Sequence, residues 1–165
     1  MGKHVLAALA VVLMLAADPV SPAPHAEGAW IALAPMAGVW DVIGCAASSA
    51  DGLIYAFGTV RYSRPFGVEV YDPVRNEWMW IGEWQGFAGG CAAVEVEGKI
   101  YIIGGYDFEG PTGRDQIYDP QMNSWATASP MPTPRGELAA VEVGGVIYAI
   151  GGYDRLSGTL AAVEA

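Results

Sequence analysis

A chain of 165 residues has room for one domain rather than two. Its 53% hydrophobic content, 16% charged content, 22 glycines and 11 prolines favour a β protein with many turns, and no sustained helical period occurs outside the N-terminus. The net charge of −10 and the lack of a basic stripe argue against nucleic acid and anionic membrane surfaces as partners.

The N-terminus has the pattern of a secretory signal. A basic start at residues 1–4 precedes an apolar run at 5–17, which is shorter than the about 20 residues of a membrane span. Residues 19–28 are rich in Pro and Ala and are expected to form an extended linker. We predict that residues 1–26 are a signal peptide and linker, that the protein is extracytoplasmic (secreted or periplasmic), and that cleavage leaves no membrane attachment; the alternative is an uncleaved anchor.

One stretch that is repeated organises the rest of the chain. Residues 98–107 read GKIYIIGGYD, and residues 145–154 read GVIYAIGGYD 47 positions later. A weaker copy, GLIYAFG at 52–58, lies 46 positions earlier. A short apolar run bounded by glycines is typical of a buried strand, and the glycine pair predicts a close backbone approach or a bulge. Three copies at a fixed period predict a repeat array.

Each repeat contains further segments that predict three more strands. Tryptophans recur at Trp30, Trp78 and Trp125, with spacings of 48 and 47 residues. A Tyr-Asp-Pro block recurs at 71–73 and 118–120, and its tyrosine precedes a tryptophan by seven residues each time. The Asp-Pro-x-x-Asn spacing within that interval is typical of a tight turn. Four strands joined by short turns predict an antiparallel meander; its small-residue strands are expected at 45–49, 91–95 and 138–143.

One set of residues carries the clearest family signature. The set that resembles the Kelch repeat comprises Arg135, YAIGG at 148–152, YDP at 118–120 and Trp125. The resemblance covers about residues 30–165 and implies β-propeller blades of four strands. We therefore predict an all-β Kelch-repeat domain over residues 27–165 with about three blades of four antiparallel strands, either a partial propeller or half of a dimeric ring.

The motif aromatic residues have two interpretations. Their fixed positions inside strands favour packing between blades, and the alternative is a ligand-stacking set. The residues concerned are Tyr55, Tyr101, Tyr148, Trp30, Trp78 and Trp125.

The two cysteines, Cys45 and Cys91, each lie ten residues before a motif tyrosine and so occupy equivalent positions in neighbouring blades. An exported protein with two cysteines could form a disulfide, but bridging requires Cα atoms within about 7 Å. Because equivalent positions in adjacent blades are usually further apart, we favour buried free thiols.

Metal and catalytic chemistry find little support in the sequence. The two histidines, His4 and His25, both lie before the repeats, so the repeats contain no histidine ligand or general base. The acidic residues Asp107, Glu109 and Asp115 lack the spacing of known calcium loops. We expect no metal, no cofactor and no catalytic residue, while enzymatic activity stays an open alternative.

In a meander of this kind, two sets of loops fall at the same end of the blades. They carry most of the arginines and several aromatic residues, which are the residue types that dominate binding hot spots. We predict an exported Kelch-type module that binds a protein or a glycan through this face. The candidate binding residues are Arg61, Arg64, Trp84, Phe108, Arg114 and Arg135.

Two other functions stay open. Some Kelch propellers are sialic-acid mutarotases, so the resemblance also admits a sugar-handling enzyme in which Arg135 beside Glu137 would hold a substrate carboxylate. The third possibility is a truncated, non-functional propeller fragment.

Counting strands predicts how the repeat array closes. The last Tyr-Asp-Pro-type strand is expected at 159–164, and the segment 30–33 has the sequence of the Trp strand that would complete its blade. Closed propellers have about four to eight blades, so three blades are too few to close a ring. A homodimer in which each chain lends its Trp30 strand to the other is one solution, and an open fragment is the alternative.

Overall fold

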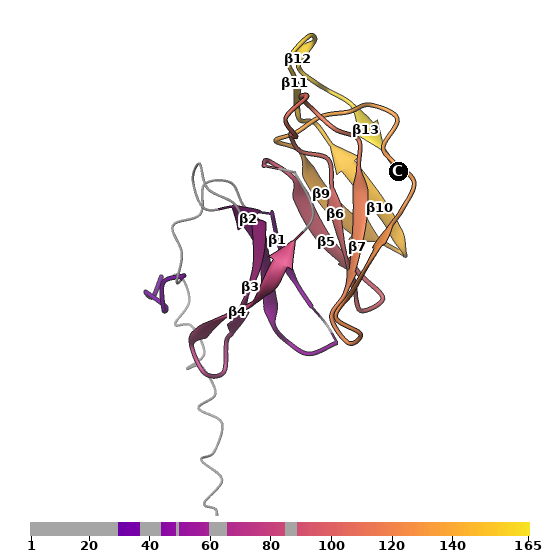
Figure 1. The fold of residues 1–165 in the computed structure, drawn as a ribbon. Helices are drawn as coiled ribbons and strands as arrows, with labels where there is room; N and C mark the ends of the chain where they lie inside the picture. Colours follow the sequence, from indigo (N-terminus) through magenta and orange to yellow (C-terminus); the bar gives the residue numbers. More distant parts are fainter. Residues whose placement is uncertain (1–29, 37–43, 49, 60–65, 85–88) are drawn as a thin grey trace, which may run out of the picture.

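The computed structural model describes residues 30–36, 44–48, 50–59, 66–84 and 89–165. These residues form strands and no helix, which confirms the all-β prediction (Figure 1). No helix with the length and hydropathy of a membrane span occurs within these ranges. The predicted signal peptide and linker lie outside them.

The first two repeats each fold into a four-stranded antiparallel sheet with its strands in chain order. The first sheet contains β1 (Gly44–Ala47), β2 (Ile54–Thr59), β3 (Phe66–Asp72) and β4 (Glu77–Trp84). The second contains β5 (Ala92–Val96), β6 (Lys99–Ile103), β7 (Asp115–Asp119) and β8 (Ser124–Thr127). The prediction of four-stranded blades is confirmed for these two copies.

The third repeat differs from the other two. Its sheet has the order β13-β10-β9, with β9 (Ala139–Val143), β10 (Val146–Ile150) and a short β13 (Val163–Glu164). The predicted strand at 159–164 is therefore wrong over most of its length. The chain first makes a hairpin of β11 (Tyr153–Asp154) and β12 (Gly158–Thr159), and this hairpin takes Thr159 as the partner of Tyr153.

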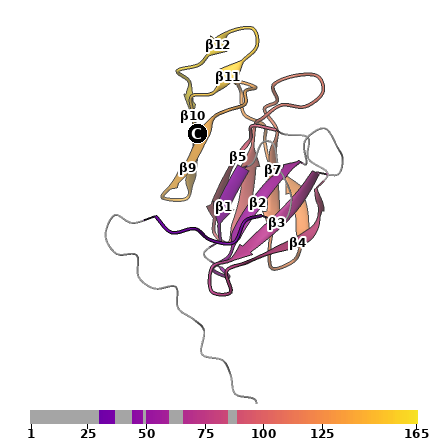
Figure 2. The ribbon, with the colours of Figure 1, turned by 90° about the vertical axis from the view of Figure 1, so that its left-hand side faces the viewer.

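The three sheets stand side by side, with their first strands nearest one another. Strand β5 contacts β1 on one side and β9 on the other. Figure 2 shows the resulting fan, in which the later strands of each sheet spread outward from this inner row. A twisted sheet that is apolar on both faces needs such neighbours because it cannot cover itself.

The turn between β3 and β4 shows why the Asp-Pro-x-x-Asn spacing recurs. The Asp72 carboxylate accepts the backbone N–H groups of Val74 and Arg75 at 2.8 and 3.1 Å. Asn76 adopts a left-handed φ of 55°, and the hydroxyl of Tyr71 donates to its Oδ1 at 2.7 Å. Asparagine tolerates this conformation better than most residues. The predicted turn chemistry is confirmed.

The seven-residue interval between tyrosine and tryptophan follows from the same turn. Tyr71 lies directly opposite Trp78 in the β3–β4 ladder, and Tyr118 lies opposite Trp125 in the β7–β8 ladder. Their ring centroids are 5.1 and 4.8 Å apart. The first two repeats thus couple a fixed turn length to a cross-strand aromatic pair, which stabilises the register of the outer hairpin.

The paired glycines confirm the predicted close backbone approach. Gly104 has a φ of +66°, and a Cβ atom there would lie 2.5 Å from the carbonyl oxygen of Arg135. Gly152 has a φ of +106°, and its Cβ would meet the Gly136 oxygen at 2.8 Å. Each residue needs both the left-handed backbone and the missing side chain, because the next loop passes directly against it.

Aromatic rings fill the space between the first and second sheets. The fully buried ring of Phe57 makes edge contacts with Trp84 and Trp125 at centroid distances of 6.0 Å. Trp84 and Trp125 stack at 6.1 Å with an interplanar angle of 17°. The packing interpretation is confirmed for Trp125. It is wrong for Trp30, which is fully exposed, and Trp78 packs within its own sheet.

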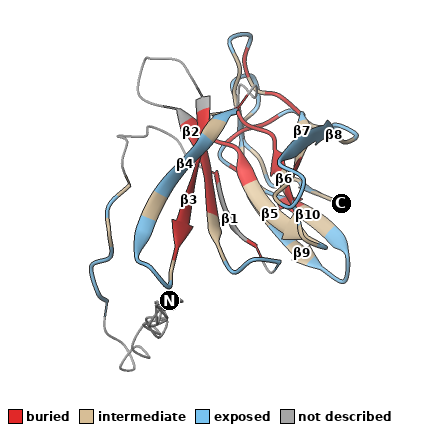
Figure 3. Ribbon diagram, turned by 60° about the horizontal axis from the view of Figure 1, so that its bottom comes forward, coloured by how far each residue is buried: buried red, intermediate tan, exposed pale blue. Residues whose placement is uncertain are grey.

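The interface between the second and third sheets is smaller and aliphatic. Its buried residues are Ala92, Ile103, Leu138 and Ala149. Figure 3 shows buried residues concentrated in β2, β3 and β6, while β4 and β9 are mostly exposed or intermediate. Burial therefore falls from the first interface to the second.

The Trp30 segment does not form the predicted closing strand of the third sheet within this chain. Residues 30–36 have no strand structure, and Ile31 and Leu33 are about half exposed. Their anchor is Ala34, whose N–H donates to Asn76 Oδ1 at 2.8 Å and whose carbonyl accepts Trp78 Nε1–H at 2.9 Å. These bonds hold the segment on the first sheet.

The prediction of buried cysteines is confirmed for one residue, since Cys91 is buried within the first interface. The side chain of Cys45 lies outside the described residues.

We predict that Phe57→Ala lowers the free energy of unfolding by about 3–5 kcal/mol, because it removes the ring at the centre of the first interface. The measurement is urea denaturation of both proteins at equal concentration. Met122→Ala is the control, since Met122 is 73% exposed in the β7–β8 turn. Similar losses in the two variants would contradict the packing described above.

Candidate functional site

Three loops gather at one end of the second and third sheets, and we call their surface the loop face. They span residues 104–114, 128–138 and 151–162 and connect strands at the end opposite the β3–β4 and β7–β8 turns. The corresponding loops of the first sheet lie outside the described residues. Two predicted binding residues, Arg61 and Arg64, belong to those loops and are not placed here.

Backbone hydrogen bonds join the first two loops of the loop face. Gly105 N–H donates to the carbonyl of Arg135 at 2.9 Å, and Met131 N–H donates to the carbonyl of Gly113 at 2.7 Å. Within the first loop, Thr112 N–H donates to the Gly105 carbonyl at 2.9 Å. The loops are therefore held in one arrangement before any partner binds, which reduces the entropy lost on binding.

The third loop is joined to the other two by a short bridge. Gly136 and Tyr153 exchange backbone hydrogen bonds of 3.1 and 2.8 Å, and the hydroxyl of Tyr106 donates to the Tyr153 carbonyl at 3.2 Å. One aromatic side chain thus spans from the first loop to the third.

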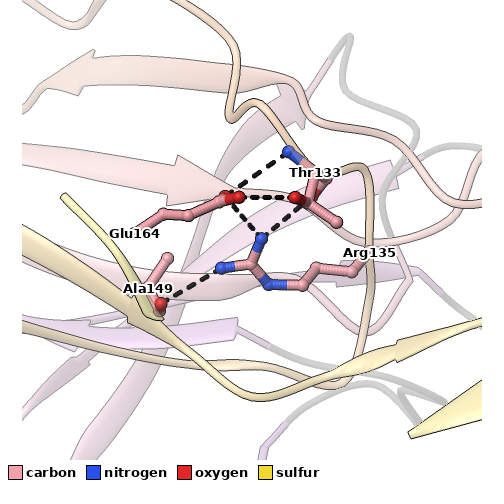
Figure 4. A network of polar contacts seen from close by, with 4 residues as sticks. All are labelled: Thr133, Arg135, Ala149 and Glu164. Atoms are coloured by element: carbon pink, nitrogen blue, oxygen red, sulfur yellow. Dashed lines mark hydrogen bonds and ion pairs between the residues drawn. The ribbon is translucent and has the colours of Figure 1, made fainter. Parts of the chain in front are cut away.

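Arg135 lies beneath the loop face with no exposed surface. Its Nη1 donates to Glu164 Oε2 at 2.6 Å and to the Thr133 carbonyl at 2.9 Å, and its Nη2 donates to the Ala149 carbonyl at 3.0 Å (Figure 4). The hydroxyl of Thr133 donates to Glu164 Oε1 at 2.5 Å. The hydrogen bond from Thr133, and after it the Arg135 guanidinium, hold the pKa of Glu164 below its ordinary value.

The prediction that Arg135 is a surface binding residue is therefore wrong. Its guanidinium ties the 128–138 loop to β10 and β13, because its bonds reach all three. The hypothetical enzyme pair of Arg135 with Glu137 is wrong too, since the arginine pairs with Glu164 and Glu137 is exposed. A substrate carboxylate on the surface would not reach this guanidinium.

Trp84 is also misplaced by the sequence prediction. It is the last residue of β4, it is buried to 3% exposure, and its indole N–H donates to Gln116 Oε1 at 3.2 Å. The prediction assigned it to the loop that follows the Trp strand, but β4 continues to this residue, whose ring stacks on Trp125.

Two predicted residues do lie on the loop face. Phe108 is 75% exposed, and the side chain of Arg114 is 56% exposed and lies 3.7 Å from the Asp107 carboxylate. Asp107 also accepts the backbone N–H groups of Glu109 and Gly110 at 2.9 and 3.1 Å, which shapes the turn that presents Phe108.

A groove crosses the loop face and draws residues from all three loops. Its volume is about 490 Å³, and its lining residues are Glu109, Pro111, Thr133, Pro134, Asp154, Arg155 and Leu156. Arg155 and Leu156 are not among the six predicted binding residues. The available signal was a large apolar residue at the tip of a tight turn, where Leu156 is 96% exposed.

Comparison with known protein families supports the predicted Kelch resemblance. The profile of the Kelch motif matches residues 88–132 and 134–165. The second and third sheets are therefore formed by Kelch motifs. The first sheet, outside the matched residues, has the same four-stranded meander as the second. Kelch repeats generally mediate protein binding, and the two matched repeats indicate a protein-binding β-propeller module. No curated protein matches the chain.

A second cavity lies between the second and third sheets, and we call it the interblade cavity. Its volume is about 500 Å³. Most of its wall is apolar, and its carboxylates are Asp115 and Glu164. Its apolar lining includes the side chains of Ile103, Met131, Ile147 and Ala149.

Asp115 is a buried carboxylic acid in the wall of the interblade cavity. Its Oδ1 is buried and has no hydrogen-bond partner, and burial raises the pKa of its carboxyl to about 6. Within the described ranges no three His, Cys, Asp or Glu side chains are grouped as metal ligands.

We predict that Arg135→Met lowers the free energy of unfolding by about 2–4 kcal/mol, because two carbonyls and one carboxylate lose a donor in the second interface. Urea denaturation measures the change. Arg75→Met is the matched control, since its ion pair with Asp72 lies on the surface and its side chain is 70% exposed. A control variant as unstable as Arg135→Met would show that the buried network has no special role.

We predict that Asp115→Asn stabilises the protein at pH 7 by about 1–2 kcal/mol, discounted for solvent screening of a partly exposed group. The folded-state pKa of about 6 lies above the ordinary 3.8, so the folded protein holds this proton more tightly than the unfolded chain. The wild type therefore loses stability as pH rises from about 4 to 6. Unfolding at pH 4 and 7 tests this; an advantage of the variant that is equal at both pH values would contradict the raised pKa.

Proposed function

We propose that this protein is an exported binding module that holds a protein partner on its loop face. The observation that carries the proposal is the groove of about 490 Å³ built from three loops whose backbones are hydrogen-bonded to one another. Binding surfaces gain affinity when their loops are ordered in advance. Export is supported by the basic start and apolar run at residues 1–17.

The chemistry of the groove favours a protein segment as its occupant. Pro111, Pro134 and Leu156 give it an apolar lining. Phe108 precedes the lining residue Glu109 in the chain and is 75% exposed. Apolar side chains of a partner would bury against these residues, since exposed aromatic and large aliphatic side chains supply most binding energy at protein interfaces.

Charged groups in the groove give a partner its orientation. Arg155 offers a guanidinium to an acidic group of the partner, and Glu109 accepts from a donor. Asp154 is less available, because its carboxylate already accepts the N–H groups of Leu156 and Ser157 at 3.2 and 3.3 Å. An extended segment with an apolar residue flanked by an acidic one fits this arrangement.

The test is a selection from a displayed random-peptide library against the purified protein, run beside a glycan array. We expect peptides with an apolar residue next to an acidic one, and no glycan series. Phe108→Ser combined with Leu156→Ser should weaken the selected peptide at least tenfold, which is about 1.4 kcal/mol.

The matched controls are Val74→Ser and Met122→Ser, two exposed apolar residues in the turns at the opposite end of the sheets. They should leave the affinity within about twofold. Binding of glycans alone, or an equal loss in the control variants, would contradict the proposed site.

A further inference from the structure

The first interface shows how the fourth strand of a blade completes its packing. Trp125 of β8 lies with its ring centroid 6.0 Å from Phe57 and 6.1 Å from Trp84, which belong to the preceding sheet. Its neighbour across the ladder, Tyr118, is 4.8 Å away. A tryptophan from the fourth strand therefore fills the outer part of the space between two blades.

The same place in the second interface is the interblade cavity. In the repeat, Ile103 is the counterpart of Phe57 at a spacing of 46 residues, and Met131 is the counterpart of Trp84 at a spacing of 47. Both line the cavity of about 500 Å³. A cavity of roughly 150 Å³ holds a benzene molecule, so this one has room for an indole ring.

An unpaired strand edge lies beside that cavity. Strand β13 pairs with β10, and no strand in the described ranges pairs with its other edge. Glu164 of β13 lines the cavity. An open edge offers backbone N–H and C=O groups that readily pair with a strand from another chain.

The Trp30 segment has the sequence that this edge lacks. Trp30 lies 48 residues before Trp78, so it occupies the fourth-strand position of the repeat. Its side chain is fully exposed, and Ile31 and Leu33 are 53% and 51% exposed. Tryptophan also has an indole N–H, the donor that Asp115 Oδ1 in the cavity wall is missing.

The segment cannot serve its own third sheet while it keeps its place. Ala34 is bonded to Asn76 and Trp78 of the first sheet, and Figure 1 shows the segment beyond that sheet, on the side away from β13. Four residues span at most about 14 Å, whereas two sheet spacings are about 20 Å. The donor is therefore a second molecule.

We propose that the outer edge of β13 and the interblade cavity form an acceptor site for residues 30–33 of a second copy of this chain. The segment adds to β13 as an antiparallel fourth strand and places Trp30 in the cavity. Two copies related by a two-fold axis each donate and each accept, which buries the exposed apolar residues of both segments. The proposal does not depend on the loop-face function.

The test compares the association of the full chain and its variants by sedimentation over a range of concentrations. Wild type should dimerise reversibly. Trp30→Ala should weaken the dimer at least tenfold, and Met131→Trp should do the same because it fills the acceptor cavity from within. Phe108→Ala is the control for loss of an exposed aromatic side chain and should leave the dimer unchanged.

Mixing the two weakened variants gives the sharpest result. Met131→Trp keeps a donor segment and Trp30→Ala keeps an open acceptor, so the mixture should form heterodimers more tightly than either variant self-associates. A labelled peptide of residues 28–36 gives the same information without Met131→Trp, and it should bind the Trp30→Ala protein at least tenfold more tightly than the peptide carrying alanine in place of Trp30. Wild type that stays monomeric, a Trp30→Ala protein that dimerises normally, or equal binding of the two peptides would overturn the proposal.

Discussion

The structure depends on the packing of each sheet against its neighbour, because a sheet with apolar residues on both faces cannot bury them alone. The second sheet satisfies this requirement on both sides, since β5 lies between β1 and β9. The two end sheets satisfy it on one side. Their remaining faces leave apolar side chains in solvent, among them Trp80 on β4 and Val143 and Ile150 on the third sheet. Surfaces of this kind mark sites of association.

The two interfaces meet the same requirement by different chemistry. The first is filled by aromatic rings around Phe57, whose contacts are apolar and tolerate small shifts. The second combines a small aliphatic core with the directional bonds of Arg135 to Glu164 and Ala149. Burying a guanidinium is costly unless its charge is paired. Here Nη1 and Nη2 are hydrogen-bonded while Nε has no partner, and the bonds that are made fix the position of the 128–138 loop. The order of the loop face therefore depends on Arg135, which is fully buried and out of reach of a partner.

Rigid loops on packed sheets suit a binding module. The backbone bonds between the loops, and the Tyr106 bridge to Tyr153, leave the tips Phe108 and Leu156 as the exposed parts of an otherwise fixed surface. Fold alone does not assign a function, and the assignment here is to protein binding because Kelch repeats generally serve it. The partner is then selected by the few side chains at those tips.

The sequence by itself determined the repeat, its strands and its turns. Local patterns carry this information: the Tyr-to-Trp interval is set by one turn and one ladder, and the glycine pair by one backbone approach. Only the tertiary structure decided which side chains of the loop face are reachable. Arg135 and Trp84 were predicted to lie on the surface because their sequence neighbours have the composition of loops. Both are in fact buried, and each contacts a residue more than 25 positions away in the sequence: Arg135 contacts Glu164, and Trp84 contacts Gln116. The position of Trp30 was likewise decided by the tertiary structure. A strand needs an edge to pair with, and the location of that edge depends on how the sheets pack rather than on the sequence of the strand.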